Sequence, residues 1–121
     1  MANEISITAQ LFNTNGIFDT RWNQTDTTNQ TIAGGISGVW DVATTLTNLS
    51  TTGITTKGYV AMRNIDTANF VEIGYNDSGT LRKFLKLKTG EMALFRVVPT
   101  VTVAGQADTA TTKVSYMVIE D

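Results

Sequence analysis

The chain of 121 residues has neither cysteine nor histidine. Without cysteine it cannot form disulfides, and it has no thiolate for catalysis or metal binding. Without histidine it lacks the commonest general base and metal ligand near neutral pH. Because these two absences remove most of the groups on which hydrolases and metalloenzymes depend, we expect neither an enzyme nor a bound cofactor.

Charged side chains are scarce as well. They make up 17% of the residues, and the net charge is −2. The densest basic cluster contains only Arg82, Lys83, Lys86 and Lys88, whereas nucleic-acid binding normally requires a larger basic patch with several phosphate contacts. Nucleic acid is therefore not an expected partner.

The chain also lacks long apolar runs. None approaches the roughly 20 residues that a membrane-spanning helix requires. The N-terminus has no basic segment followed by an apolar stretch, which a secretory signal would show. We therefore expect a chain that is made in the cytoplasm and has no membrane span.

What the chain does contain is a series of short segments in which apolar and polar residues alternate, separated by turns rich in Asn, Asp, Gly and Thr. This pattern predicts an all-β, antiparallel β-sandwich. We expect one domain over residues 1–121, with the most regular β meander over residues 58–121. The 22 threonines suit half-solvated strands. The strands expected in the meander are 58–65, 69–74, 84–88, 92–98, 101–104 and 113–119.

The N-terminal part should begin with a strand or arm over residues 1–12, because Ile5 and Ile7 alternate with polar neighbours. Residues 13–16 have the composition of a turn. A further strand is expected over residues 38–46, where alternation places Trp40 and Val42 on one face and Val39 and Asp41 on the other.

Residues 17–38 leave two interpretations open. They form either a long loop over the sandwich or a pair of edge strands, and we favour short strands near 21–24 and 30–33. A structureless segment of that length is uncommon unless it is functional. Isolated apolar residues there, together with the N-terminal pair, are the candidate interface residues: Ile5, Ile7, Phe18, Trp22 and Ile32.

Asp66 and Glu72 are the one pair of acids that could meet across a hairpin, as glycoside cleavage requires. Asp66 lies in a turn, however, where such a side chain usually caps backbone amides, and alternation directs Glu72 outward. Residues 19–26 and 76–79 resemble calcium loops only in composition, and their acids lack the alternating spacing of such a loop. We therefore expect no catalytic pair and no metal site.

The aromatic residues allow two interpretations. Exposed rings would form a platform for sugars, whereas buried rings would fill the core or a subunit interface. Trp40 is expected in the core or an interface because it lies within a strand, and Trp22 fits either interpretation. Five further residues are assigned to the core by pattern: Phe70, Leu85, Leu94, Tyr116 and Val118.

Three stretches carry a family resemblance: Gly58–Gly74 with Arg-Asn-Ile-Asp and Phe-Val-Glu-Ile-Gly, Leu87–Arg96 with Leu-Lys-Thr-Gly-Glu-Met-Ala-Leu-Phe-Arg, and the C-terminal strand Lys113–Asp121. Over roughly residues 58–121 the chain resembles small virion proteins of tailed bacteriophages. It looks similar to capsid decoration (cement) proteins and to head or tail fibre modules.

The resemblance implies a jelly-roll-like sandwich located on the virion. It implies a decoration protein that binds the major capsid protein on the outside of the shell, stabilises the shell, and forms a homo-oligomer, such as a trimer. The alternative that it implies is a fibre or knob module that binds host-surface carbohydrate through Trp22, Trp40 or Tyr59. Neither role requires a cofactor.

Overall fold

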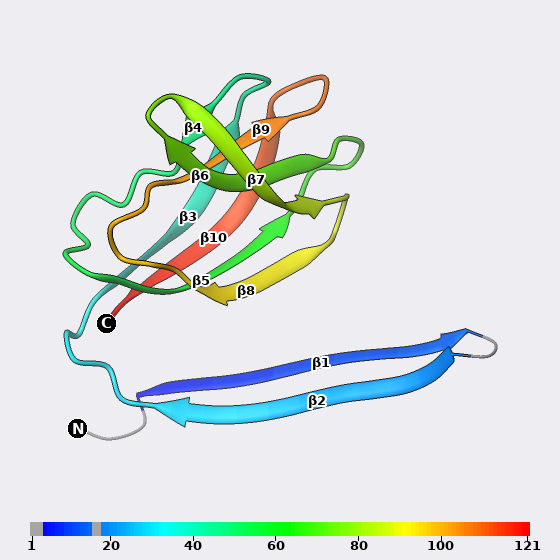
Figure 1. Ribbon diagram of the computed structural model, residues 1–121, viewed down its shortest axis with the longest axis vertical. Helices are drawn as coiled ribbons and strands as arrows, with labels where there is room; N and C mark the ends of the chain where they lie inside the picture. The colour runs from blue at the N-terminus through cyan, green and yellow to red at the C-terminus, as the bar shows by residue number, and fades with distance from the viewer. Residues whose placement is uncertain (1–3, 16–17) are drawn as a thin grey trace. The chain divides into compact units, whose positions relative to one another are not determined.

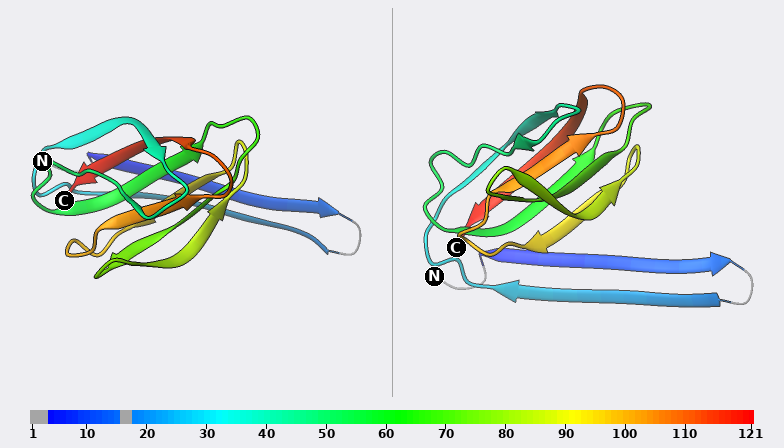
Figure 2. Two further views of the ribbon diagram at one scale, coloured as in Figure 1. Left: turned by 90° about the horizontal axis from the view of Figure 1, so that it is seen from above. Right: turned by 45° about the horizontal axis from the view of Figure 1, so that its top comes forward.

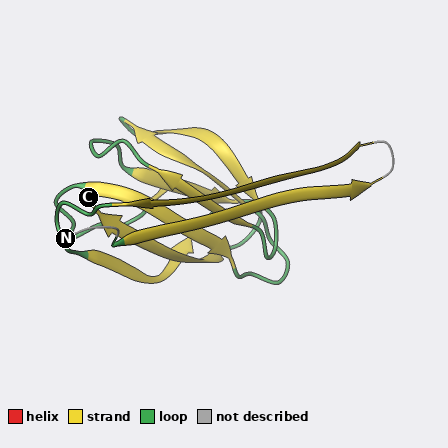
Figure 3. Ribbon diagram, turned by 90° about the horizontal axis from the view of Figure 1, so that it is seen from below, coloured by secondary structure: helices red, strands yellow, loops and turns green. Residues whose placement is uncertain are grey.

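The computed structural model describes residues 4–15 and 18–121, and the side chains of all of these except residues 15 and 18–20. The described part is built from ten strands and contains no helix (Figure 1, Figure 3). The chain divides into two compact units, residues 1–32 and 33–121. Each unit is described here by itself, and the expected single domain over residues 1–121 stays a prediction.

The first unit is a long antiparallel hairpin. Its strands β1 (Ile5–Asn15) and β2 (Phe18–Thr28) pair without interruption, from Ile5 opposite Thr28 to Asn15 opposite Phe18. The strand predicted near residues 21–24 is confirmed and is much longer than expected. The strand predicted near residues 30–33 is wrong, because none of these residues is in a strand and Thr31 and Ile32 form a bend.

The turn predicted at residues 13–16 lies partly outside the described residues, and Asn13 and Thr14 belong to β1. A polar segment forms a regular strand here because β-branched threonines suit cross-strand pairs. Thr8 lies opposite Thr25, and Ser6 lies opposite Thr27.

The second unit is a sandwich of two four-stranded antiparallel sheets, so the predicted all-β sandwich is confirmed (Figure 2). The first sheet has the order β3 (Gly35–Val42), β10 (Thr112–Glu120), β5 (Lys57–Asn64), β8 (Met92–Arg96). The second sheet has the order β4 (Thr47–Asn48), β9 (Val103–Ala107), β6 (Val71–Asp77), β7 (Thr80–Leu87). All six strands predicted over the meander are present, with ends shifted by a few residues.

The core lies between the two sheets and is made by the inward-facing half of each alternation. Trp40 and Val42 are buried while Val39 and Asp41 are exposed, so the predicted faces of this strand and the core position of Trp40 are confirmed. Each fully buried Val or Ile contributes roughly 1.5–3 kcal/mol. The buried apolar cluster consists of Trp40, Val42, Leu49, Val60, Met62, Val71, Ile73, Leu87, Val103, Ala107, Val114 and Val118.

A tight turn and a β-bulge shape strand β7, which forms one edge of the second sheet. Ser78 and Gly79 connect β6 and β7 with positive φ angles of 52° and 94°, as a two-residue hairpin loop requires. The register of β7 against β6 then shifts between Ile73, which faces Leu85, and Gly74, which faces Lys83. Phe84 is left over as the extra residue of a β-bulge, which reorients its side chain.

Candidate interaction surfaces

The acidic residues considered for catalysis are engaged in structural contacts. The carboxylate Oδ1 of Asp66 accepts hydrogen bonds from the backbone N–H groups of Ala68 (2.9 Å) and Asn69 (3.0 Å), and these bonds lower the pKa of Asp66. Glu72 points outward and pairs with Nζ of Lys83 at 3.0 Å. Within residues 4–15 and 18–121, no group of three or more acidic, His or Cys side chains could hold a metal ion.

One face of the hairpin carries apolar side chains of β1, opposite polar residues of β2 and Trp22. Cross-strand partners share a face, and Leu11 lies opposite Trp22. Because side chains alternate along a strand, Ile5, Ile7 and Ala9 lie on this same face. We call this surface the Trp22 face. Leu11 and Trp22 are exposed, Ile7 and Ala9 are half-buried, and Ile5 is buried.

Of the five candidate interface residues, the structure therefore brings three onto one surface, Ile5, Ile7 and Trp22. The side chain of Phe18 lies outside the described residues. Ile32 follows β2 in a segment without strand structure, where it is exposed.

The opposite face of the hairpin is polar apart from one aromatic ring. Ser6, Thr8 and Gln10 lie on it. Phe12 also lies there, and the Arg21 guanidinium stacks 5.3 Å from its ring centroid. The two faces thus offer a matched pair of exposed aromatics, Trp22 at 55% and Phe12 at 54% exposure.

The outer face of the first sheet is unexpectedly apolar. The strand registers align Ser37, Met117, Ala61 and Leu94 in one row across all four strands, and Val39, Ser115, Arg63 and Met92 in the next. Val39, Met92, Leu94 and Met117 are all exposed. A sheet face in contact with water normally carries polar side chains, so this face is a candidate docking surface, which we call the first-sheet face.

The outer face of the second sheet has the opposite character. Glu72 and its register partner Gln106 lie on it, and the Glu72–Lys83 ion pair covers the β6–β7 strands. Lys86 extends over the ring of Phe70, with Nζ 4.0 Å from the centroid. The apolar outer surface is therefore specific to the first sheet.

The assignment of Leu94 to the core is wrong, because Leu94 is 46% exposed. Met92 to Arg96 is apolar on both alternations except at its end, so the sequence does not reveal which half faces inward. In the structure Ala93 and Phe95 pack against the core. Val118 is buried and Leu85 and Tyr116 pack against the core, as predicted, while Phe70 is half-buried beneath Lys86.

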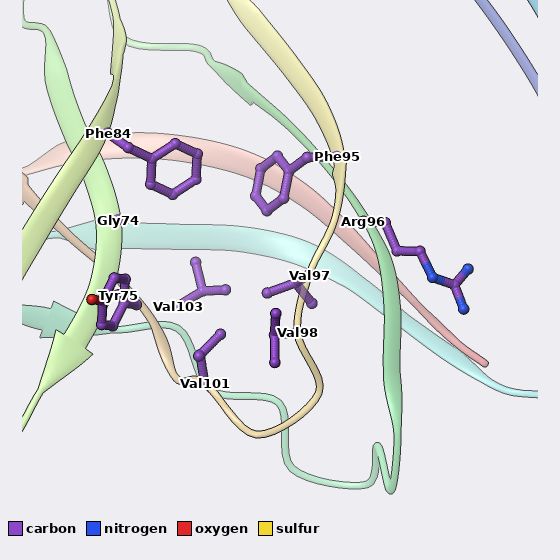
Figure 4. A pocket seen from close by; sticks show the side chains of 9 residues that line it. All are labelled: Gly74, Tyr75, Phe84, Phe95, Arg96, Val97, Val98, Val101 and Val103. Carbon is purple, nitrogen blue, oxygen red and sulfur yellow. The ribbon is translucent and has the colours of Figure 1, made fainter.

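A pocket of about 390 Å³ lies at the side of the sandwich where the edge strands β7 and β8 approach each other (Figure 4). Phe84 of the bulge and Phe95 of β8 meet there edge to face, with ring centroids 5.9 Å apart and an interplanar angle of 82°. The lining residues are Gly74, Tyr75, Phe84, Phe95, Arg96, Val97, Val98, Val101 and Val103. The sequence gives no signal for this pocket, because the bulge that reorients Phe84 has no motif.

Arg96 belongs to the margin of this pocket. Figure 4 shows its side chain directed away from the apolar cluster. Its guanidinium pairs with the carboxylate of Asp121 and lies 5.2 Å from the ring centroid of Tyr59. The pocket itself is lined mainly by valine and aromatic side chains, so it suits an apolar group.

The described part of the chain is all-β, and both its hairpin and its first sheet expose apolar side chains. No protein-family model, curated protein or solved structure matches the chain. Among the described residues, no helix is long and apolar enough to cross a membrane.

Proposed function

We propose that this protein is a capsid decoration protein of a tailed bacteriophage, which binds the major capsid protein on the outer surface of the assembled shell and stabilises it. The observation that carries the proposal is the apolar first-sheet face, with Leu94 and Met117 exposed in its central row. Exposed apolar patches of this kind mark protein interaction sites.

The order of the strands supports the viral setting. The orders β3-β10-β5-β8 and β4-β9-β6-β7 agree with an eight-stranded jelly roll, a double Greek key that is common in viral capsid and lectin domains. We infer that the sandwich is of this type. The fold alone does not define a function, and the proposal therefore depends on the first-sheet face.

The test is to add purified protein to capsid shells that lack it, and to measure cosedimentation and the melting temperature of the shells. Saturable binding should raise the melting temperature, because a ligand that binds only the assembled state stabilises that state. Leu94→Lys and Met117→Lys should abolish binding. Thr80→Lys, an exposed change on β7 of the second sheet, serves as the matched control and should bind normally.

A second candidate function is supported by the exposure of Trp22, and it is a fibre or knob module that binds host-surface carbohydrate. Of the three aromatics considered for a sugar platform, Trp40 is buried and the ring of Tyr59 is occupied by Arg96. Binding to host cells or glycans that is lost in Trp22→Ala, together with no binding to shells, would favour this function over decoration.

A further inference from the structure

The Trp22 face is buried at Ile5 but exposed at Leu11 and Trp22, and the hairpin itself does not cover this exposed end. A two-stranded hairpin is at best marginally stable in water, because it has no second layer against which to bury its apolar side chains. Leu11 and Trp22 form an adjacent exposed pair towards one end of this hairpin. An exposed tryptophan next to an exposed leucine is the kind of anchor that fills a pocket at the centre of an interface.

The pocket beside Phe84 and Phe95 is apolar and could receive exposed apolar side chains such as Trp22 and Leu11. Its volume of about 390 Å³ lies within the range of approximately 300–1,000 Å³ that is typical of binding sites. The exposed side chains of Phe84 and Val98 form part of its lining. Aromatic rings in edge-to-face contact with an indole ring gain stability beyond area burial.

The charges of the hairpin and of the strands beside the pocket also favour docking of the Trp22 face into the pocket. Residues 1–32 carry Glu4, Asp19 and Asp26 against Arg21, which gives −3 + 1 = −2. Asp26 lies on the Trp22 face, opposite Ile7.

Of the four cations on the strands that flank the pocket, Arg82, Lys83 and Arg96 are each paired with an acid of the sandwich. Exposed ion pairs of this kind are worth only about 0–1 kcal/mol. They can therefore exchange partners for Asp26 at small cost.

We propose that the Trp22 face of one copy of this chain docks into the Phe84–Phe95 pocket of a second copy, with Trp22 and Leu11 as the anchors. The contact is heterologous, because a hairpin of one subunit meets the sandwich of another. Such contacts form a ring if the rotation between neighbouring subunits closes and an open filament if it does not; the proposed assembly is the closed one.

The area of one hairpin–pocket contact is too small to hold two copies together, so a closed oligomer with several such contacts is required. Each strand of the hairpin has 11 residues, and at about 3.4 Å per residue and 4.8 Å between strands one face covers roughly 360 Å². Because Ile5 is already buried, a single docked hairpin buries less than roughly 700 Å² on both partners together, which is below the approximately 1,000 Å² expected of a stable interface. A chain that both provides and receives a hairpin takes part in twice that area.

The test measures molar mass by light scattering over a range of protein concentrations, without any capsid shells, so that its outcome is independent of the proposed shell binding. The wild-type chain should have a multiple of the monomer mass of 13.1 kDa. Trp22→Ala and Val98→Glu should each be monomeric, with unfolding midpoints in urea close to wild type, because both side chains are exposed.

Phe12→Ala is the matched control, because Phe12 is equally exposed on the opposite face of the hairpin. It should leave the molar mass unchanged. A wild-type chain that is monomeric at every concentration would overturn the proposal. So would an oligomer that persists in Trp22→Ala and Val98→Glu, or one that Phe12→Ala dissociates as well.

A crosslinking experiment tests the contact directly, since the chain has no cysteine of its own. Gln24→Cys lies on the Trp22 face, opposite Ala9, and Thr100→Cys lies exposed beside the pocket residues Val98 and Val101. When equal amounts of the two single variants are mixed and oxidised, disulfide-linked heterodimers should exceed the half of all dimers that random pairing gives. Heterodimers no more frequent than random pairing predicts would contradict the assignment.

Discussion

Asn64 is the residue whose replacement should be most damaging relative to its size. It is fully buried at the end of β5. Its amide Nδ2 donates to the backbone carbonyls of Asn69 (2.9 Å) and Leu87 (3.0 Å), and its Oδ1 accepts from the backbone N–H of Asp66 (2.9 Å). One side chain thus joins β5 in the first sheet to the end of β7 in the second.

The expected loss of unfolding free energy follows from these three hydrogen bonds. Asn64→Ala leaves two carbonyls and one N–H group without their partner, and each buried unsatisfied group costs about 1–3 kcal/mol. Only the bond to Leu87 is fully buried, while the other two are partly buried. The free energy of unfolding should therefore fall by about 4 kcal/mol, a large part of the 5–15 kcal/mol typical of a domain.

The assay is equilibrium unfolding in urea, with the loss read from the midpoint at an unchanged slope. Asn48→Ala is the control, because Asn48 is exposed and accepts a single hydrogen bond, from Nδ2 of Asn76 at 3.0 Å. Its loss should be at most about 1 kcal/mol. If Asn64→Ala were no more destabilising than Asn48→Ala, the role assigned to the buried amide would be refuted.

Three further predictions use the same unfolding assay. Gly74→Ala should cost about 2 kcal/mol, because a Cβ at the bulge would overlap the backbone carbonyl oxygen of Arg82; an unchanged midpoint would contradict this geometry. Leu94→Ala should change stability by less than about 1 kcal/mol, whereas Leu87→Ala, at a buried position, should cost about 3 kcal/mol, and equal losses would show that Leu94 is not on the outer surface. Asp66→Asn should be less stable than wild type at neutral pH, because hydrogen bonds lower the pKa of Asp66 in the folded state from its ordinary value of 3.8. The stability that this carboxylate contributes is fully present above its ordinary pKa and is lost as the pH falls through its lower pKa in the folded state. The unfolding midpoints of Asp66→Asn and wild type should therefore converge below about pH 3.8. A difference that stays constant with pH would contradict this role of Asp66.

The sequence was sufficient for the parts of the fold in which one alternation is apolar and the other polar. Trp40 and Val42 against Val39 and Asp41 gave the correct inward face, and Asp66 was recognised as a turn residue whose carboxylate accepts hydrogen bonds from backbone N–H groups. Both features depend on neighbouring residues, which a sequence displays directly.

The sequence was insufficient where the structure depends on residues that are far apart in the chain. The second hairpin strand contains Asn, Gln, Thr and Asp, with Trp22 as its one large apolar residue beyond Phe18. Its strand structure follows from pairing with β1, to which it contributes a partner at every position. Leu94 was assigned inward because its strand is apolar on both alternations, and the pocket was missed because a single extra residue, Phe84, changes the register of β7.

If the protein has the proposed decoration role, the size of the first-sheet face limits how tightly one copy binds a shell. β8 has five residues, so four strands of that length cover roughly 300 Å² at about 3.4 Å per residue and 4.8 Å between strands. Docking this face would bury roughly 600 Å² in total, which is below the approximately 1,000 Å² of a stable interface. Stable attachment therefore requires several copies to bind together, since linked sites raise the overall affinity by about 10²–10⁴.

Variants of the Trp22 face and of the first-sheet face should therefore have different effects on oligomerisation and on shell binding. Trp22→Ala leaves the first-sheet face intact but should make the protein monomeric, and we expect its affinity for shells to fall at least tenfold. Leu94→Lys should remain oligomeric and fail to bind shells. If monomeric Trp22→Ala bound shells as tightly as wild type, the first-sheet face would be sufficient by itself and the coupling between the two surfaces would be wrong.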